Sequence, residues 1–339
     1  MKAMILCAGL GTRLRPFTER WPKPALPLLG QPLFRYHLAV LRAAGVRAVG
    51  INTHHLPDVM AATARAECER AGLSLHVVHE PVIQGTGGGI RGLRDFLSDG
   101  DFLVFNGDIL FPVDLAPVVR AHRESGAAAT MVLLPMPENE TYASVDMDSG
   151  GRVGRIAGLG PGGEGLIPWH FTGVHVMSPR VFDFMSPEGP EDINREVYVR
   201  MMRAGLPVRG HTVRSYWSDL GTPSRYLATV RDVLEGRAAL DGLGPDSPFA
   251  LAPRGPGNAW RHASARVDAR VEGPAHFDAG CTVARGALVG ASVSVGAGVR
   301  VGEGARLERS ALLEGTEVAP GESLVDVMAW GAHRVRAPL

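Results

Sequence analysis

A short segment near the start of the chain combines small residues with cations. Residues 8–24 read Ala-Gly-Leu-Gly-Thr-Arg-Leu-Arg-Pro-Phe-Thr-Glu-Arg-Trp-Pro-Lys-Pro. Small residues let backbone N–H groups close around an anion, while Arg13 and Lys23 add positive charge at two separately anchored points. This pattern predicts a nucleotide triphosphate as ligand. We expect its nucleotide contacts at Ala8, Gly9, Gly11 and Thr12.

Two familiar phosphate-binding motifs are absent from this segment. A dinucleotide-binding fingerprint would need a third glycine at position 14, where the chain has Leu14. A Walker loop would need Gly-Lys-Ser/Thr after four intervening residues, and Thr-Arg-Leu-Arg follows Gly11 instead. A turn that merely joins a strand to a helix is the structural alternative.

The segment as a whole resembles the motif of sugar-phosphate nucleotidyltransferases, the nucleoside-diphosphate-sugar pyrophosphorylases. In that family a Gly-x-Gly-x-Arg-x-x-Pro run is followed by Pro-Lys-Pro, as in residues 9–24 here. The resemblance implies transfer of a nucleotidyl group from an NTP to a sugar 1-phosphate. It also implies that Arg13 and Lys23 are catalytic residues.

Two aspartates are candidate ligands for Mg²⁺. Asp108 follows Asn-Gly at the end of a predicted strand, with Gly107 as a further nucleotide contact, and Asp219 lies in a Trp-Ser-Asp turn. Carboxylate oxygens are hard ligands that suit Mg²⁺. In the resembling family, these two positions carry the metal-binding carboxylates. As structural alternatives, Asp108 forms a turn and Asp219 caps a helix that begins near Thr222.

Residues 79–90, His-Glu-Pro-Val-Ile-Gln-Gly-Thr-Gly-Gly-Gly-Ile, resemble the loop that reads the base in this family. We expect Glu80, Gly85 and Thr86 to contact the nucleotide. A carboxylate at Glu80 can accept from both N1–H and N2–H₂ of guanine, which favours guanine as the base. The Gly-Thr-Gly-Gly pattern and a repeat in the C-terminal part are similar to those of mannose-1-phosphate guanylyltransferases. The motifs are also similar to N-acetylmuramate-1-phosphate uridylyltransferases. A uridylyl- or thymidylyltransferase acting on that sugar or on glucose 1-phosphate, and a non-catalytic nucleotide-sugar-binding regulatory paralogue, therefore stay open.

The sugar side is less complete. Thr172 and Gly173 match a family strand that faces the sugar. Many relatives also carry a Glu-Lys-Pro whose lysine meets the sugar phosphate, and this chain has no lysine between residues 153 and 170. Its possible substitutes are Arg152, Arg155 and Arg195.

Apolar runs that alternate with helical patterns indicate an α/β fold. We predict a Rossmann-like, mixed but mainly parallel sheet sandwiched by helices. The predicted strands are 2–7, 47–52, 74–79, 102–105, 128–134, 144–147, 153–156 and 170–177, and the predicted helices 33–44, 58–71, 88–97, 115–125 and 193–204. Ligands of such sheets bind beyond the carboxyl ends of the strands, so the 9–13 loop and the 106–108 turn should converge.

A period of six residues marks the C-terminal part. Its apolar members are Val271, Phe277, Val283, Val289, Val295, Val301, Leu307 and Leu313. The period resembles the hexapeptide repeat of left-handed parallel β-helices, with three hexads to a coil. Its unbroken run leaves no inserted loop for the catalytic His of a hexapeptide-repeat acyltransferase. We therefore divide the chain into a catalytic domain 1–236, a linker 237–258, a β-helix 259–330 and a tail 331–339.

Composition narrows the partners. The 339 residues include 35 basic and 35 acidic side chains without a long run of either sign, which argues against nucleic acid or an anionic membrane as partner. Three widely spaced cysteines and the lack of an 18-residue apolar run favour a cytoplasmic protein. Because a short β-helix buries little core by itself, we expect it to pack on the catalytic domain or on another subunit. We expect a homo-oligomer.

Overall fold

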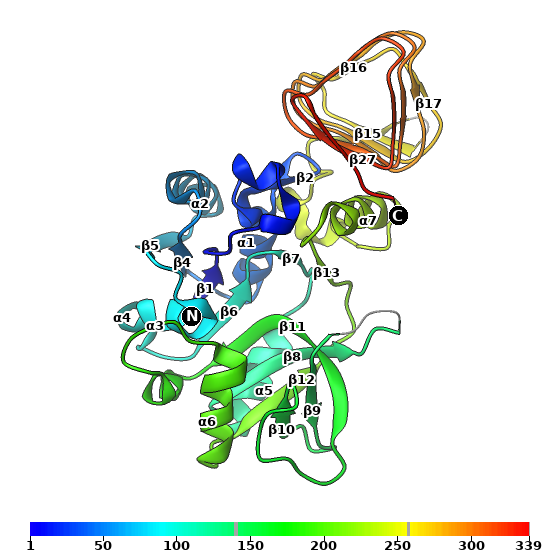
Figure 1. The fold of residues 1–339 in the computed structure, drawn as a ribbon. Coiled ribbons are helices and arrows are strands. Elements are labelled where there is room, and N and C mark those ends of the chain that lie inside the picture. Colours follow the sequence, from blue (N-terminus) through cyan, green and yellow to red (C-terminus); the bar gives the residue numbers. More distant parts are fainter. Residues whose placement is uncertain (139–141, 256–257, 339) are drawn as a thin grey trace. The chain divides into compact units, whose positions relative to one another are not determined.

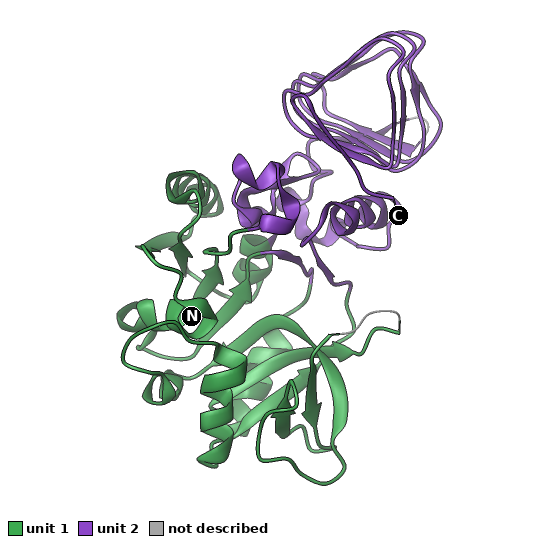
Figure 2. Ribbon diagram, viewed as in Figure 1, with its two compact units in different colours: residues 1–10, 37–107, 113–215 green, residues 11–36, 108–112, 216–339 purple. Residues whose placement is uncertain are grey.

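The computed structural model describes residues 1–138, 142–255 and 258–338. The chain forms two compact units, coloured separately in Figure 2. Unit 1 comprises residues 1–10, 37–107 and 113–215, and unit 2 comprises residues 11–36, 108–112 and 216–339. Each unit is therefore built from segments that are distant in the sequence.

Unit 1 contains a nine-stranded mixed sheet (Figure 1). Its main path runs β10-β9-β11-β6-β1-β4-β5, and β8 pairs with β11 and β12. The strands β1, β4, β5 and β6 are mutually parallel, whereas β11 pairs antiparallel with β6. The bounds are β1 Lys2–Leu6, β4 Ala48–Thr53, β5 Ser74–His79, β6 Phe102–Asn106, β8 Ala129–Pro135, β9 Ser144–Met147, β10 Val153–Ile156, β11 Ile167–Met177 and β12 Val208–Thr212. The sequence predicted all of them except β12, with β11 beginning earlier than expected.

Helices pack on the strands of this sheet. Helix α2 lies against β4 and β5, α5 against β8 and β11, and α6 against β10 and β12. The bounds are α1 Leu33–Ala43, α2 Pro57–Ala71, α3 Gly85–Gly92, α4 Arg94–Leu97, α5 Ala116–Ser125 and α6 Tyr198–Arg203. A 3-10 helix covers Pro179–Phe184, and a π-helical turn at Ile193–Val197 precedes α6. The single helix predicted at 88–97 is wrong, because α3 begins at Gly85 and Leu93 separates it from α4.

The core of unit 1 lies between this sheet and its helices. Buried side chains of β6, α4, β8 and β11 pack there with those of α6, among them Phe102, Leu97, Met177 and Tyr198. Strands buried on both faces read as continuous apolar runs, as β6 does with Phe-Leu-Val-Phe. That burial makes the carboxyl ends of β1, β4, β5 and β6 a fixed edge for functional residues.

Unit 2 begins with the segment that follows the glycine-rich turn. Three 3-10 helices occur at Thr12–Leu14, Phe17–Glu19 and Lys23–Ala25, followed by the β2–β3 hairpin (Pro27–Leu28 and Gln31–Pro32). The short strands β7 (Ile109–Leu110) and β13 (Ser218–Asp219) form an antiparallel pair. Helix α7 spans Pro223–Leu234, and the side chain of Thr222 caps it. The alternative that Asp219 caps this helix is therefore wrong.

The C-terminal part of unit 2 is a triangular parallel β-helix (Figure 1). Its three faces stack β15-β18-β21-β24-β27, β16-β19-β22-β25 and β17-β20-β23-β26. The bounds are β15 Ala259–Arg261, β16 Arg266–Val267, β17 Arg270–Val271, β18 Ala275–Phe277, β19 Thr282–Val283, β20 Leu288–Val289, β21 Val293–Val295, β22 Arg300–Val301, β23 Arg306–Glu308, β24 Ala311–Leu312, β25 Glu317–Val318, β26 Ser323–Val325 and β27 Val327–Trp330. Stacked valines and leucines fill the interior.

Two details of the β-helix differ from the sequence pattern. Val295 pairs with Leu312, so the prediction that Leu313 continues the column is wrong. Arg309 adopts a left-handed conformation before the buried Ser310, and the corner there is one residue shorter than a hexad. The ends also carry covers: β14 (Arg254–Gly255) pairs antiparallel with β15, and β28 (His333–Arg336) pairs antiparallel with β27. Such pairing protects edges that would otherwise recruit other strands.

Within the predicted linker 237–258, a 3-10 helix occurs at Asp241–Asp246, and the backbone O of Ser247 accepts from Nε2 of Gln31 at 3.1 Å. Residues 256 and 257 of that segment, and residue 339 of the predicted tail, lie outside the described residues. The three cysteines are buried and not disulfide-bonded. Within the described ranges, no helix has both the length and the apolar character needed to span a bilayer.

Candidate active site

Strand ends in unit 1 bring several predicted residues together. The N–H of Gly107, after β6, donates to the O of Leu6 in β1 at 3.1 Å. The N–H of Cys7 donates to Oδ1 of Asn52, at the end of β4, at 2.9 Å. Ala8 and Gly9 follow directly, and a Cβ added to Gly9 would meet no atom within 4 Å. The backbone at Gly9 therefore has open space for a ligand to approach closely.

Glu80 follows β5 at the same edge and is buried. Its Oε1 accepts from Nδ2 of Asn52 at 2.7 Å, and its Oε2 accepts from the N–H of Gln84 at 2.9 Å. Glu80 thus ties the end of β4 to the turn that begins α3. Each carboxylate oxygen keeps a second acceptor position beyond these bonds.

The glycine-rich helix α3 follows Glu80. Five of its eight residues are glycine, which costs roughly 0.8–1 kcal/mol each relative to alanine in a helix interior. Close packing explains this composition. A Cβ at Gly85 would lie 2.5 Å from the O of Glu191, and one at Gly89 would lie 2.7 Å from Nδ2 of Asn52. Thr86 is engaged as well, because its Oγ1 accepts from the N–H of Ile193 at 2.9 Å.

On β11, the two predicted sugar-side residues differ. Thr172 is buried, and its Oγ1 donates to the O of Val132 at 2.8 Å. Gly173 has φ +87°, and a Cβ there would lie 2.6 Å from Nδ2 of Asn106 at the end of β6. Asn106 therefore faces the backbone of Gly173. Its amide is a polar group at this edge that the motif reading passed over.

The glycine-rich turn continues into unit 2 from Gly11 onward. Gly11 has φ +63°, and its O accepts from Oγ1 of Thr18 at 2.9 Å. A Cβ at Gly11 would lie 2.7 Å from Cγ2 of Thr18, so only glycine fits this turn. Thr12 and Arg13 follow and are exposed. The Arg13 guanidinium is adjacent to Gly221, where a Cβ would lie 2.8 Å from Nη2.

One candidate metal ligand, Asp219, lies in β13, and the other, Asp108, directly precedes its partner strand β7. Asp219 in β13 is the register partner of Ile109, the residue after Asp108, and the N–H of Leu220 donates to the O of Asp108 at 2.9 Å. Lys23 Nζ lies 2.9 Å from Oδ2 of Asp108. The carboxylate of Asp219 accepts from the N–H of Gly221 at 2.9 Å and pairs with Arg225.

Three cations and two carboxylates therefore make up this cluster, which we call the phosphate cluster: Arg13, Lys23, Asp108, Asp219 and Arg225. Its formal charge is +1, from three positive and two negative groups, which favours an anionic ligand. No group of three or more His, Cys, Asp or Glu suited to a metal occurs among the described residues. Mg²⁺ is bound through one or two carboxylates together with substrate phosphates, so a two-carboxylate donor set fits it.

The β-helix supports the segment that carries Lys23. Trp21, in the turn before Pro22, packs edge-on against Trp330 of β27 with ring centroids 5.3 Å apart. A Cβ at Gly30, in the β2–β3 turn, would lie 2.2 Å from Oδ2 of Asp278. Tyr226 of α7 donates to the O of Pro27. Repeat coils and α7 therefore hold both flanks of the Pro-Lys-Pro turn.

The possible substitutes for the absent lysine remain separate candidates. Arg152 and Arg195 are exposed. Arg155 lies 3.9 Å from Asp146, with 45% of its side chain exposed.

Residues 2–236 match the model of the nucleotidyl transferase family. The chain belongs to this family. It is 32% identical over 248 residues to UTP--glucose-1-phosphate uridylyltransferase of Synechocystis, covering 69% of this chain and 63% of that protein. It is 33% identical over 238 residues to mannose-1-phosphate guanylyltransferase of Mycobacterium tuberculosis, covering 70% and 65%. The chain thus spans just under two thirds of the length of these two relatives.

A solved structure shows the same fold. HddC from Yersinia pseudotuberculosis aligns with a TM-score of 0.55 and 20% identity, covering 67% of this chain and 96% of that one. Both sequence relatives are sugar-phosphate nucleotidyltransferases by name, and enzymes of this family typically use a divalent metal. The resemblance inferred from residues 8–24 is confirmed.

Sequence reasoning missed several polar residues that these contacts reveal. Asn52 and Gln84 bind Glu80, Asn106 packs on Gly173, and Arg225 pairs with Asp219. Arg225 alone had a local signal, since it lies in the first turn of a helix that begins at a recognised Thr-Pro. Asn52 and Asn106 lie at strand ends that only the folded sheet brings next to their partners, and Gln84 lies in the turn before α3.

Proposed function

We propose that this chain transfers a nucleotidyl group from an NTP to a sugar 1-phosphate and releases pyrophosphate. The phosphate cluster carries this proposal, because it combines a carboxylate in β13 and one directly before the paired strand β7 with three cations beside a glycine turn. The family membership supports the same reaction class.

The reaction brings two anions together, so charge neutralisation and in-line positioning set its barrier. An oxygen of the sugar 1-phosphate forms a bond to the α-phosphorus of the NTP, and the bond from that phosphorus to the pyrophosphate oxygen breaks. Arg13 and Lys23 supply fixed positive charge to the phosphates. Asp108 and Asp219 would hold Mg²⁺, which supplies further neutralisation of the phosphates when bound. No covalent bond to the protein is required.

We propose GTP and mannose 1-phosphate as the substrates. The capacity of the Glu80 carboxylate to accept from N1–H and N2–H₂ of guanine supports this choice, as does the named activity of the Mycobacterium relative. The Synechocystis relative supports the alternative, a uridylyl- or thymidylyltransferase acting on glucose 1-phosphate. N-acetylmuramate 1-phosphate is a further candidate sugar.

A matrix of four NTPs against these three sugar 1-phosphates, read as pyrophosphate release, tests the proposal. We expect GTP with mannose 1-phosphate to give the highest kcat/KM. Glu80→Gln should narrow the preference for GTP over UTP, because it places a donor where guanine also donates. Preference for UTP or dTTP would refute the guanine assignment, and no pyrophosphate from any pair would refute the reaction.

The remaining elements of the proposal concern setting and assembly. We propose a cytoplasmic homo-oligomer with a catalytic domain at 1–236 and a β-helix at 259–330. Three buried thiols that form no disulfide support a reducing compartment. Light scattering of the purified chain tests the oligomeric state.

A further inference from the structure

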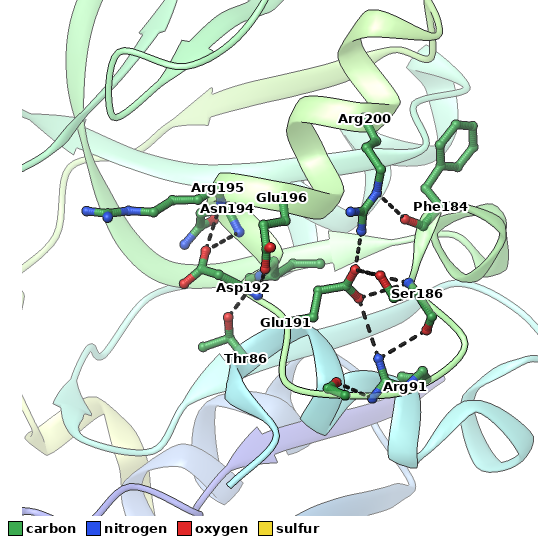
Figure 3. A network of polar contacts seen from close by, with 12 residues as sticks. Thr86, Arg91, Phe184, Ser186, Glu191, Asp192, Asn194, Arg195, Glu196 and Arg200 are labelled. Atoms are coloured by element: carbon green, nitrogen blue, oxygen red, sulfur yellow. Dashed lines mark hydrogen bonds and ion pairs between the residues drawn. The ribbon is translucent and has the colours of Figure 1, made fainter.

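A polar network that the proposed reaction does not use connects α3 to residues between 184 and 200 (Figure 3). At its centre is Glu191, whose side chain is 2% exposed. Its carboxylate accepts from the N–H of Ser186 at 3.0 Å and from Oγ of Ser186 at 2.8 Å, and it pairs with Arg200. Arg91 of α3 lies 3.7 Å away. These partners compensate a carboxylate that would otherwise be costly to bury.

The same residue binds α3 through its backbone. The O of Glu191 accepts from the N–H of Gly87 at 2.8 Å and of Gly88 at 3.3 Å, and its own N–H donates to the O of Gln84 at 2.8 Å. The first N–H groups of a helix have no partner within the helix. Glu191 therefore satisfies the N–H groups of Gly87 and Gly88. These two groups follow those of Gly85 and Thr86 in the same turn.

Arg91 closes the network from the far end of α3. It donates to the O of Ser186 at 3.1 Å and to the O of Gly189 at 2.6 Å. We call residues 186–193 the strap, since both ends of α3 are bonded to it. Burial acts to raise the pKa of the Glu191 carboxyl, but hydrogen bonds from Ser186 and Arg200 outweigh it and hold the pKa below its ordinary value. Glu191 is therefore charged at neutral pH.

We propose that Glu191 is a positioning residue for the NTP. Its ion pairs fix the strap, and the strap fixes the turn from Gln84 to Gly88 that receives the nucleotide. This inference rests on the proposed function. Glycine at 85 and 87 makes the fit possible, because a Cβ at either position would meet Glu191. The same glycines give the backbone of this turn more conformational freedom, which the strap restricts.

Two variants weaken the network from opposite sides. Glu191→Gln keeps the shape and removes the charge, whereas Arg200→Met removes a partner whose side chain is 41% exposed. The matched control is Glu67→Gln in α2, where a carboxylate that is 9% exposed pairs with Arg70 at 2.9 Å. Circular dichroism of each variant verifies folding. Hydrogen exchange of residues 84–92 without substrates, NTP binding by titration, and KM for both substrates are then measured.

We expect both network variants to exchange at least tenfold faster at Gly87 and Gly88 than the wild type. The KM for the NTP should rise about tenfold, with the KM for sugar 1-phosphate and kcat at saturating NTP within threefold. The control should change none of these values. Unchanged exchange at 84–92, or an equal effect in the control, would overturn the inference. Faster exchange and weaker NTP binding in a protein that releases no pyrophosphate would instead overturn only the proposed function.

Discussion

Replacing Lys23 by alanine should separate catalysis from stability. Nζ of Lys23 lies 2.9 Å from Oδ2 of Asp108, and the two side chains are 12% and 35% exposed. Ion pairs with a solvent-exposed partner contribute about 0–1 kcal/mol to folding. At roughly 2–4 °C per kcal/mol, the melting temperature of Lys23→Ala should fall by no more than about 4 °C.

The effect on turnover should be much larger. A cation held at the phosphates acts where charge develops, and loss of one such preorganised group typically costs about 10²–10³ in kcat, or about 2.7–4 kcal/mol. Pro22 and Pro24 restrict the backbone on either side of Lys23, so its ammonium is positioned before substrate binds. A large loss of turnover together with a small decrease in melting temperature would identify Lys23 as a catalytic residue.

The chain offers a matched control, because Lys2 is its only other lysine. Nζ of Lys2 pairs with Asp99 at 2.6 Å in unit 1. Lys2→Ala should lower the melting temperature by a similar amount and leave turnover unchanged. Pyrophosphate release and thermal unfolding are measured on both variants. Lys23→Ala at more than a third of wild-type turnover, or an equal loss in Lys2→Ala, would refute the role of Lys23.

Three further predictions follow from the structure. Asp108→Asn and Asp219→Asn keep the size of the side chain but remove the negative charge that a hard cation needs. Both variants should therefore lose at least 10²-fold in turnover and require a higher Mg²⁺ concentration. Unchanged activity of the wild type in EDTA would contradict the two-carboxylate site. Burial lowers the pKa of His175 to about 3, so the unfolded chain binds a proton at this imidazole before the folded chain does as the pH falls below about 6.5. The free energy of unfolding should therefore decrease by about 2 kcal/mol between pH 7 and pH 5. The free energy of unfolding of His175→Gln should depend less steeply on pH, and an identical pH dependence would exclude His175 as the cause. Trp330→Ala should lower the free energy of unfolding by about 1–2 kcal/mol, because it removes the contact with Trp21. It should also reduce turnover, because the segment that carries Lys23 loses this support. Light scattering measures the assembly in parallel, and full turnover per folded site would limit the β-helix to a role in stability or assembly.

How far the sequence predicts this protein depends on the range of the interactions. The strands of unit 1 apart from β12, and the β-helix, could be predicted because burial leaves a local pattern in the sequence. This pattern is a continuous apolar run for a strand buried on both faces and a period of six for a coil face. Four of the five members of the phosphate cluster could also be predicted. Arg13 and Lys23 share one segment, and Asp108 and Asp219 lie in short motifs. The fifth member, Arg225, was missed. These patterns need no knowledge of which strands are neighbours.

Tertiary structure alone decided the rest. Glu80 appeared as a base reader, and only the adjacency of β4 and β5 revealed its bond to Asn52. Its bond to Gln84, four residues further along the chain, depends on the fold of the turn before α3. The column in the β-helix passes to Leu312 because the corner at Arg309 is shortened, while an apolar residue at 313 kept the spacing of six on paper. Glu191 looked like one acidic residue among many. Sequence by itself determined which residues could do chemistry, because side-chain type and short spacing are local. The structure determined what holds them, because buried hydrogen bonds and ion pairs join residues that the chain separates by scores of positions.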